Sequence, residues 1–185
     1  MKYFCEVEGK MKRKIVNHWT ASGFAPNKDD LLHYHFLIDC CGKVYKGVFP
    51  VSANDDCKDN NYAAHVGGLN TNHIGVALCG MESFVSPQKT GNYKLTKIQI
   101  EKLFELNAML IKTEGWSSAT EENLITHYEI GKKVLSEEIP RTPLTAQNIG
   151  KIDIVYLPPY PDIKPDDIGN FIRGKTNQYL NNLNC

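Results

Sequence analysis

The sequence RKIVNHWTA, residues 13–21, opens with an apolar run and ends in polar residues. This pattern predicts a buried strand that runs into a polar turn. His18 lies near the end of the expected strand. Strand ends that lead into loops are the places where α/β proteins carry their functional sites. His18 is therefore the first candidate site residue in the chain.

Similar patterns after this run predict a sheet. Four further strands are expected, at residues 34–38, 44–48, 73–79 and 123–126. The residues DCCGK between the first two of these strands predict a hairpin. Residues 22–32 are loop-like, with room for one short helical turn at most, and residues 49–72 predict a long loop rich in Asn, Asp and Gly. A loop of that length in a compact domain is more often functional than idle.

Two helices complete the expected fold. Residues 95–114 carry apolar side chains at helical spacing, and Thr96 and Gln99 have the spacing of a capping box at the helix start. A second helix is expected over residues 165–183. The sequence therefore predicts a single α/β domain, residues 1–185, with a central mixed sheet of about four to six strands packed by helices.

The composition is that of an ordinary soluble globular protein, with 42% hydrophobic and 23% charged residues. Lys plus Arg and Asp plus Glu each number 21, so the formal net charge is zero. A general nucleic-acid binder would need a basic surface, and this charge argues against one. No apolar run is long enough for a transmembrane helix or for the core of a secretory signal. The chain is therefore expected in the cytoplasm where it is made, without membrane insertion.

The six cysteines are Cys5, Cys40, Cys41, Cys57, Cys79 and Cys185. None of them forms a Cys-x-x-Cys pair, so a zinc knuckle is not expected. Cys40 and Cys41 are expected in a strand, with their side chains on opposite faces. Without an export signal, most of the thiols are expected to be reduced.

A catalytic zinc site commonly takes three protein ligands and leaves a fourth position open. Like His18, His127 follows an expected strand and precedes an expected loop. Asp153 and Lys151 lie in the segment GKIDIVYLP, among loop signals. The residues alone leave two interpretations open. These side chains could share one site, or they could be two structural histidines, a surface lysine and a turn aspartate.

His33 and His35 offer a rival metal site. Residues i and i+2 of a strand share a face, so both imidazoles could bind one ion. Tyr34 would then face the opposite side of the strand. The alternative is that both histidines are half-buried strand residues without a ligand.

The order of five segments along the chain is informative. The segments IVNHWTAS, HYHFLIDCCGKVYKG, AAHVGGLNTNHIGVALCG, LITHYEIGKK and GKIDIVYLP follow one another. Together they resemble the type 2 N-acetylmuramoyl-L-alanine amidases, a superfamily that includes the peptidoglycan recognition proteins and the amidase-type lysozymes of phages. The resemblance covers roughly residues 13–157, with the helix at 165–183 included. It implies a fold like that of the peptidoglycan recognition proteins and amidases.

The resemblance also implies roles for particular residues. It implies one zinc ion per chain, with three ligands: His18, His127 and Asp153. Lys151 matches a catalytic lysine of the family, and Tyr34 matches a tyrosine that lines the site in the phage enzymes. His65 stands where the family has a histidine in the substrate groove. The rival site at His33 and His35 loses support, because the family places Tyr34 toward the metal.

The chain departs from the family pattern in three places. Ala77 stands where some cytosolic wall-recycling relatives have a catalytic glutamate, and this matches the phage-type pattern. Only residues 22–32 lie between the first and the second expected strand, so the helix that relatives carry there is expected to be missing or very short. Residues 132–150 contain an insertion relative to compact members. One role that this insertion could have is that of a substrate-binding lip.

The function that the resemblance implies is hydrolysis of the amide bond between N-acetylmuramic acid and L-alanine in peptidoglycan. The expected protein is a monomeric phage endolysin that is made in the host cytoplasm and lyses the host by acting on the cell wall after release. Two alternatives stay open. One is a cytosolic bacterial amidase that recycles muropeptides, against which Ala77 counts. The other is a non-catalytic peptidoglycan recognition module, although members that only bind usually lack one metal ligand.

Overall fold

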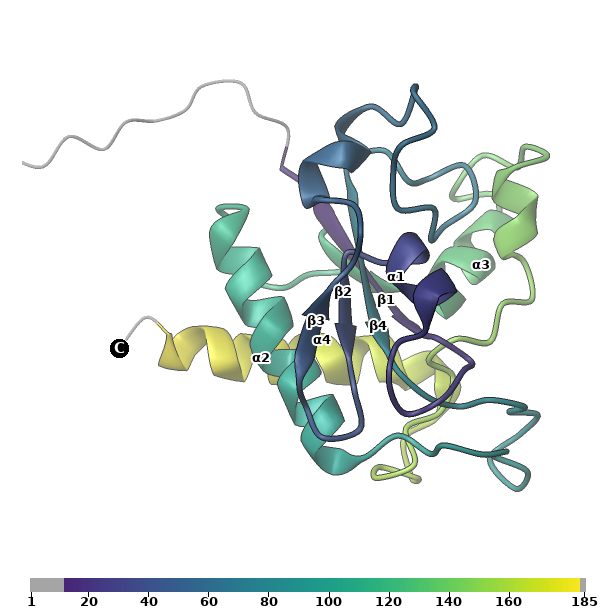
Figure 1. Cartoon of the computed structure of the whole chain (residues 1–185), viewed down its shortest axis with the longest axis vertical. Helices are drawn as coiled ribbons and strands as arrows, with labels where there is room; N and C mark the ends of the chain where they lie inside the picture. Colours follow the sequence, from purple (N-terminus) through teal and green to yellow (C-terminus); the bar gives the residue numbers. More distant parts are fainter. Residues whose placement is uncertain (1–11, 184–185) are drawn as a thin grey trace, which may run out of the picture.

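The computed structural model describes residues 12–183, and a five-stranded sheet forms its centre (Figure 1). Across the sheet the strands are β3 (Val44–Lys46), β2 (Phe36–Ile38), β4 (His73–Leu78), β1 (Lys14–Trp19) and β5 (Leu124–Thr126). Strands β2, β4, β1 and β5 are parallel, whereas β3 runs antiparallel to β2 at one edge. The predicted α/β fold with a central mixed sheet is therefore confirmed.

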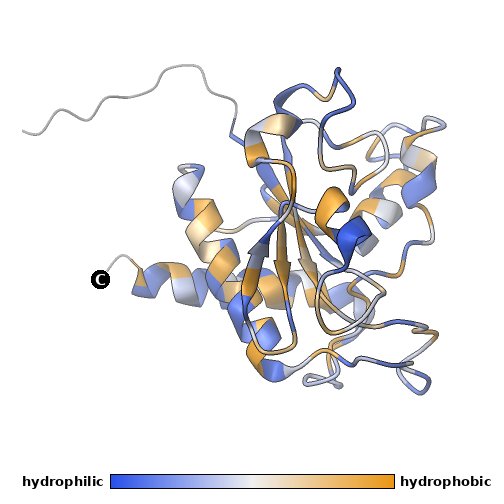
Figure 2. Ribbon diagram, in the orientation of Figure 1, coloured by the Kyte–Doolittle hydropathy of each residue, from blue (hydrophilic) through white to orange (hydrophobic). Residues whose placement is uncertain are grey.

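Helices and loops cover both faces of this sheet. The helices are α1 (Lys28–His33), α2 (Lys97–Thr113), α3 (His127–Leu135) and α4 (Ile168–Asn182). Ile15 of β1 belongs to the core under α2 and α4, whereas Val16 packs on the opposite face, with α3. Figure 2 shows hydrophobic residues along the sheet between these layers. Because alternate residues of a strand share a face, His18 lies on the same side as Val16.

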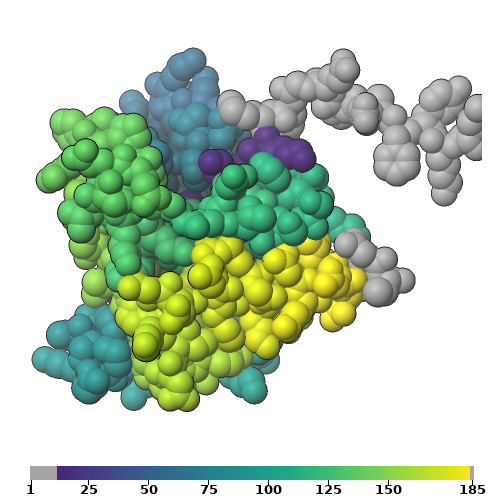
Figure 3. All heavy atoms as spheres, turned by 180° about the vertical axis from the view of Figure 1, so that it is seen from behind, coloured from purple at the N-terminus to yellow at the C-terminus, as the bar shows by residue number. Residues whose placement is uncertain are grey.

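α2 and α4 form one layer behind the sheet. α2 begins at the predicted capping box of Thr96 and Gln99. α4 follows a short 3-10 turn at Pro165–Asp167 and lies beside α2 on the rear of the molecule (Figure 3). The fully buried Phe104 of α2 meets the ring of Phe171 of α4 edge to face. Within residues 12–183, every helix is too short or too polar to cross a membrane.

Two stretches expected as loops contain α-helices, and the expected loop at 49–72 contains a 3-10 helix, Val51–Asp55. α1 is longer than the single turn expected there, and its start is fixed by a capping box of Asn27 and Asp30. The prediction that a loop follows His127 is wrong, because this residue begins α3. Thr126 caps α3, and Glu129 completes the capping box. The Thr-x-x-Glu spacing at this point is a helix-start signal.

The rival metal site requires His33 and His35 to lie in one strand, but β2 begins later than predicted. His33 is the last residue of α1, Tyr34 caps that helix, and β2 begins at Phe36. His33 is exposed, whereas His35 is buried with 2% of its surface accessible. The two imidazoles therefore do not share a strand face, and the geometric premise of the rival site is wrong.

Cys40 and Cys41 lie in the turn between β2 and β3 rather than in a strand. Their Sγ atoms are 3.8 Å apart, so the prediction that they point to opposite faces is wrong. The turn brings the two side chains to one side of the backbone. Both are free thiols, as are Cys57 and Cys79. The remaining cysteines, Cys5 and Cys185, lie outside the described residues.

Candidate metal centre

Three side chains meet at the carboxyl ends of β1 and β5. Nδ1 of His18 lies 3.0 Å from Oδ2 of Asp153, and Nδ1 of His127 lies 2.8 Å from the same oxygen. One possible ligand atom from each residue lies within 4.8 Å of the other two. The structure thus brings together the three residues that the sequence predicts as ligands. Their role in binding a metal stays a prediction.

Strand pairing explains why the two histidines converge. β1 and β5 are parallel neighbours, and Asn17 pairs with Thr126 in their register. His18, still in β1, and His127, the first residue after β5, follow this pair in the chain, and their ring centroids are 4.7 Å apart. Asp153 reaches the same edge from a turn that follows the 3-10 helix at Thr145–Asn148.

Asn148 contacts the second ring nitrogen of His127. Nε2 of His127 lies 3.0 Å from Oδ1 of the Asn148 amide. Gly67 fixes the orientation of that amide, because its N–H donates to Oδ1 at 3.0 Å and its carbonyl accepts from Nδ2 at 2.9 Å. Oδ1 is therefore an acceptor, and His127 must donate from Nε2. A neutral His127 then has its lone pair on Nδ1, directed at Asp153.

This arrangement fits a cation. Nδ1 of a neutral His127 and the carboxylate of Asp153 are both electron-pair donors, yet they lie 2.8 Å apart. Two such donors approach this closely only where a proton or a metal ion neutralises their repulsion. Two imidazole nitrogens and one carboxylate oxygen also form a ligand set of catalytic zinc. The residues present therefore suit a zinc ion.

His65 lies behind His18. Nε2 of His18 is 3.1 Å from Nδ1 of His65. The His65 ring lies against the backbone of β4 at Gly75, where a Cβ atom would come within 2.7 Å of the ring. His65 is 7% exposed, and its Nε2 has no hydrogen-bond partner among the described residues. The structure places this ring in contact with a candidate ligand, and its predicted role in substrate binding stays a prediction.

Burial sets the charges at this centre. It lowers the pKa of His18 to about 4, although the hydrogen bond with Asp153 acts in the opposite direction. Burial of Asp153 favours its neutral form, but the close contacts with His127 and His18 outweigh this effect and hold the carboxyl pKa far below its usual value. At neutral pH the centre therefore offers a neutral His18 and an ionised Asp153. These are the forms that bind metal ions.

Tyr34 and Lys151 lie beside the three candidate ligands. The Tyr34 ring is 5.1 Å from the His18 ring, and burial, followed by the charge of Asp153, raises the pKa of its hydroxyl. Tyr34 is therefore a neutral hydrogen-bond donor at neutral pH. Lys151 is exposed, and its charge contributes to the lowered pKa of His18. The structure thus brings both predicted catalytic residues to the centre, and their catalytic role stays a prediction.

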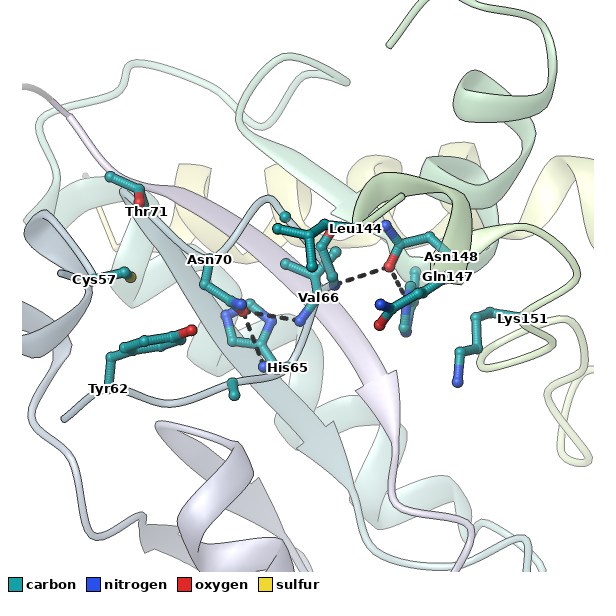
Figure 4. Close-up of a pocket in the computed structure, with 14 residues that line it drawn as sticks. Cys57, Tyr62, His65, Val66, Asn70, Thr71, Leu144, Gln147, Asn148 and Lys151 are labelled. Carbon is teal, nitrogen blue, oxygen red and sulfur yellow. Dashed lines mark hydrogen bonds between the residues drawn. The ribbon is translucent and has the colours of Figure 1, made fainter. Parts of the chain in front are cut away.

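Two cavities adjoin at this centre. One has a volume of about 470 Å³ and is lined by residues that include Tyr34 and Asp153. The other, of about 440 Å³, lies between residues 62–71 and the 3-10 helix at Thr145–Asn148 (Figure 4). Four residues line both cavities: Ala64, His65, His127 and Lys151. The candidate metal centre therefore lies between two hollows large enough for the parts of a branched ligand.

The insertion at 132–150 forms a wall of the second cavity, through Leu144, Gln147 and Asn148. The insertion therefore borders a cavity at the centre, and its role as a substrate-binding lip stays a prediction. Sequence reasoning missed Asn148 itself. No sequence pattern around Asn148 indicates its role, because its partner Gly67 is 81 residues away in the chain.

A family model described as N-acetylmuramoyl-L-alanine amidase matches residues 9–139. The match spans well over half of the 185 residues. The chain belongs to this family. In this N-acetylmuramoyl-L-alanine amidase family member, His18 and His127 lie inside the matched residues, whereas Lys151 and Asp153 lie beyond them.

Solved structures of two amidases and one endolysin are similar to this family member at low identity. The amidase LysC from Clostridium intestinale URNW is 20% identical, with a TM-score of 0.43 over 74% of this chain and 81% of the other. The Ph2119 endolysin from the Thermus scotoductus MAT2119 bacteriophage Ph2119 is 20% identical, with a TM-score of 0.42 over 77% and 88%. AmiD from E. coli is 18% identical, with a TM-score of 0.44 over 65% and 50%. All three TM-scores are below 0.5, so family membership rests on the family model. No curated protein matches the sequence.

Proposed function

We propose that this protein is a zinc-dependent amidase that cuts the bond between N-acetylmuramic acid and L-alanine in peptidoglycan. One zinc ion per chain would be held by His18, His127 and Asp153. The observation that carries the proposal is the convergence of two Nδ1 atoms and one carboxylate oxygen in a chain of this family. The hydrogen bond from His127 to Asn148 supports it, because it leaves the correct nitrogen free for a metal.

Bound zinc would supply a Lewis acid and would make water more acidic. The protein's own groups have the remaining tasks. Lys151 places a positive charge where the oxyanion of amide hydrolysis develops, and Tyr34 can donate a hydrogen bond to the same oxygen. Asp153 is a weak proton acceptor because its pKa is so low, so its task is to bind the metal. His65 lines both cavities and stands next to any substrate that fills them.

The two adjoining cavities suit a substrate that branches at the scissile bond. Peptidoglycan has this shape, since a peptide leaves the glycan strand at the lactyl group. Our proposal for the biological role is a phage endolysin that acts as a monomer on the cell wall. The residue that favours it over a muropeptide-recycling enzyme is Ala77, which is fully buried in β4 and cannot supply a carboxylate.

Digestion of purified peptidoglycan by the zinc-loaded protein tests this proposal. New amino groups on alanine are expected, without new reducing sugar ends. A chelator should stop the reaction, and added zinc should restore it. Reducing ends would refute the amidase activity, and binding to the wall without release of amino groups would identify a recognition module. A strong preference for small anhydro-muropeptides over polymeric wall would identify a recycling enzyme.

Metal analysis of variants tests the site independently of activity. His18→Ala should bind little zinc, whereas His33→Ala, which removes an exposed histidine on α1, should bind one ion per chain. Tyr34→Phe should bind zinc and lose activity. If His18→Ala kept its metal while His33→Ala lost it, the proposed centre would be wrong.

A further inference from the structure

Asn148 is a buried asparagine whose amide has four hydrogen bonds. It is 1% exposed. Oδ1 accepts from the Gly67 N–H and from Nε2 of His127, both at 3.0 Å. Nδ2 donates to the carbonyls of Gly67 and Thr145, both at 2.9 Å. Figure 4 shows this amide in the wall of the second cavity. Every hydrogen-bonding position of the side chain is thus used.

The contact with His127 decides where that imidazole carries its proton. Without an acceptor at Nε2, the proton of a neutral ring would move to Nδ1 and bond to Asp153, which lies 2.8 Å away. A proton on Nδ1 blocks the position that a metal must take. With the Asn148 oxygen present, the proton is held on Nε2 and Nδ1 keeps its lone pair.

The same amide joins the candidate ligand to the loop at 62–71. The backbone fits closely at both contacts, because a Cβ atom on Gly67 would lie 2.6 Å from the carbonyl oxygen of Leu144. On the other side, a Cβ atom on Gly131 of α3 would lie 2.3 Å from the carbonyl oxygen of Asn148. α3, which begins at His127, and the cavity wall are therefore packed as one unit through Asn148.

We propose that Asn148 is a positioning residue that fixes the tautomer and ring orientation of His127 and couples this ligand to the wall of the adjoining cavity. The inference rests on the proposed zinc site. Partners that orient the histidine ligands of metal sites change metal affinity by about 10–100-fold when they are mutated. Through Asn148, the insertion at 132–150 thus positions a ligand of the proposed metal centre, in addition to its predicted role as a substrate-binding lip.

The chain contains a matched control for this role. Asn54 is fully buried, and its Oδ1 accepts from the Ala63 N–H at 2.9 Å and from Nε2 of His35 at 3.0 Å. Its Nδ2 donates to the carbonyls of Ala63 and Asn70 at 2.9 and 3.1 Å. Asn54 therefore holds the same loop with the same set of bonds, but the histidine that it contacts is not a candidate ligand.

The test compares Asn148→Leu, Asn148→Asp and Asn54→Leu with the wild type. Zinc affinity is measured by competition with a chelator, and the urea midpoint is measured on the metal-free proteins. Asn148→Leu should weaken zinc binding by about 10–100-fold. Asn148→Asp keeps an acceptor for Nε2 and should bind zinc at least as tightly as the wild type. Both lose the Nδ2 bonds, so both should have lower urea midpoints.

Asn54→Leu should lower the urea midpoint as well, yet leave zinc affinity unchanged. If it weakened zinc binding as much as Asn148→Leu, loop stability would control the site and the proposal would be overturned. Equal zinc affinities for Asn148→Leu and wild type, or equal losses for Asn148→Asp and Asn148→Leu, would overturn it too.

A second readout does not need zinc. Long-range nitrogen–proton spectra of the metal-free proteins report which His127 nitrogen carries the proton. The wild type and Asn148→Asp should show it on Nε2, and Asn148→Leu should show it on Nδ1. The same pattern in Asn148→Leu and wild type would contradict the positioning role. Absence of zinc binding in every protein, with the expected spectra, would instead reject the zinc site alone.

Discussion

Replacing His35 by glutamine should make the unfolding free energy less sensitive to acid. His35 donates from Nε2 to Asn54, and its Nδ1 accepts from the Gly75 N–H at 2.9 Å. A glutamine amide can both donate and accept, so His35→Gln retains part of this bonding. The imidazole is 2% exposed, and burial lowers its pKa from 6.5 to about 4. The hydrogen bond with Asn54 acts in the opposite direction, whereas the charge of Arg13 lowers the pKa further.

The sign follows from proton binding. Between the folded pKa of about 4 and the unfolded value of 6.5, the unfolded chain binds a proton at this residue that the folded chain does not. His35 therefore contributes its full stability above the unfolded pKa and loses it as the pH falls toward the folded value. With these two values, linkage gives a loss of about 2 kcal/mol between roughly pH 7.5 and roughly pH 5.

The assay is urea unfolding of metal-free wild type and His35→Gln at these two pH values. The destabilisation caused by His35→Gln should be about 2 kcal/mol smaller at the lower pH, because the variant no longer has this titrating group. His33→Gln, at an exposed position on α1, controls for the substitution and should change the unfolding free energy by less than about 0.5 kcal/mol. A destabilisation by His35→Gln that is the same at both pH values would refute the reasoning.

Three further outcomes are expected. Arg173 is 7% exposed and pairs with Glu129 at 2.8 Å, so Arg173→Met should lower the free energy of unfolding in urea by about 3–5 kcal/mol. The double variant with Glu129→Gln should lose less than the sum of the two single variants, and additive losses would contradict this. Lys151→Ala should keep its zinc and lower turnover by about 10²–10³-fold, whereas near-normal turnover would remove the residue from the mechanism. In the native protein, alkylation should label the exposed Cys41 and spare the buried Cys79, because burial raises the pKa of the Cys79 thiol to about 12. After alkylation of the unreduced, denatured protein, mass spectrometry should find most of the six cysteines labelled.

The strands were predictable because each is a short apolar run with its own boundaries. β1 and β4 each contain five buried residues in succession, and such runs stand out in a sequence. α3 was missed because His127 was interpreted as a residue before a loop. The capping pair of Thr126 and Glu129 was visible in the sequence, but its helix is short, with nine residues, and gives a weak periodic signal.

The candidate site was predictable only in part from its residues. The pairing of His18 with His127 depends on β1 and β5 being neighbours, and strand order is not encoded near either residue. The resemblance to a family supplied that pairing together with Asp153. Contacts such as Asn148 with Gly67 join distant loops through one side chain, and local patterns carry no information about them.

The position of β1 between β4 and β5 has a consequence for how the chain folds. Lys14 pairs with His73 and Ile15 with Leu124, so the partners of β1 follow it about 60 and about 110 residues later in the chain. The contact between His18 and Asp153 spans 135 residues. Closing loops of this length costs entropy before any contact repays it, which predicts slow refolding. The residues of the proposed metal centre meet only through this long-range pairing, so we do not expect a metal ion to nucleate folding.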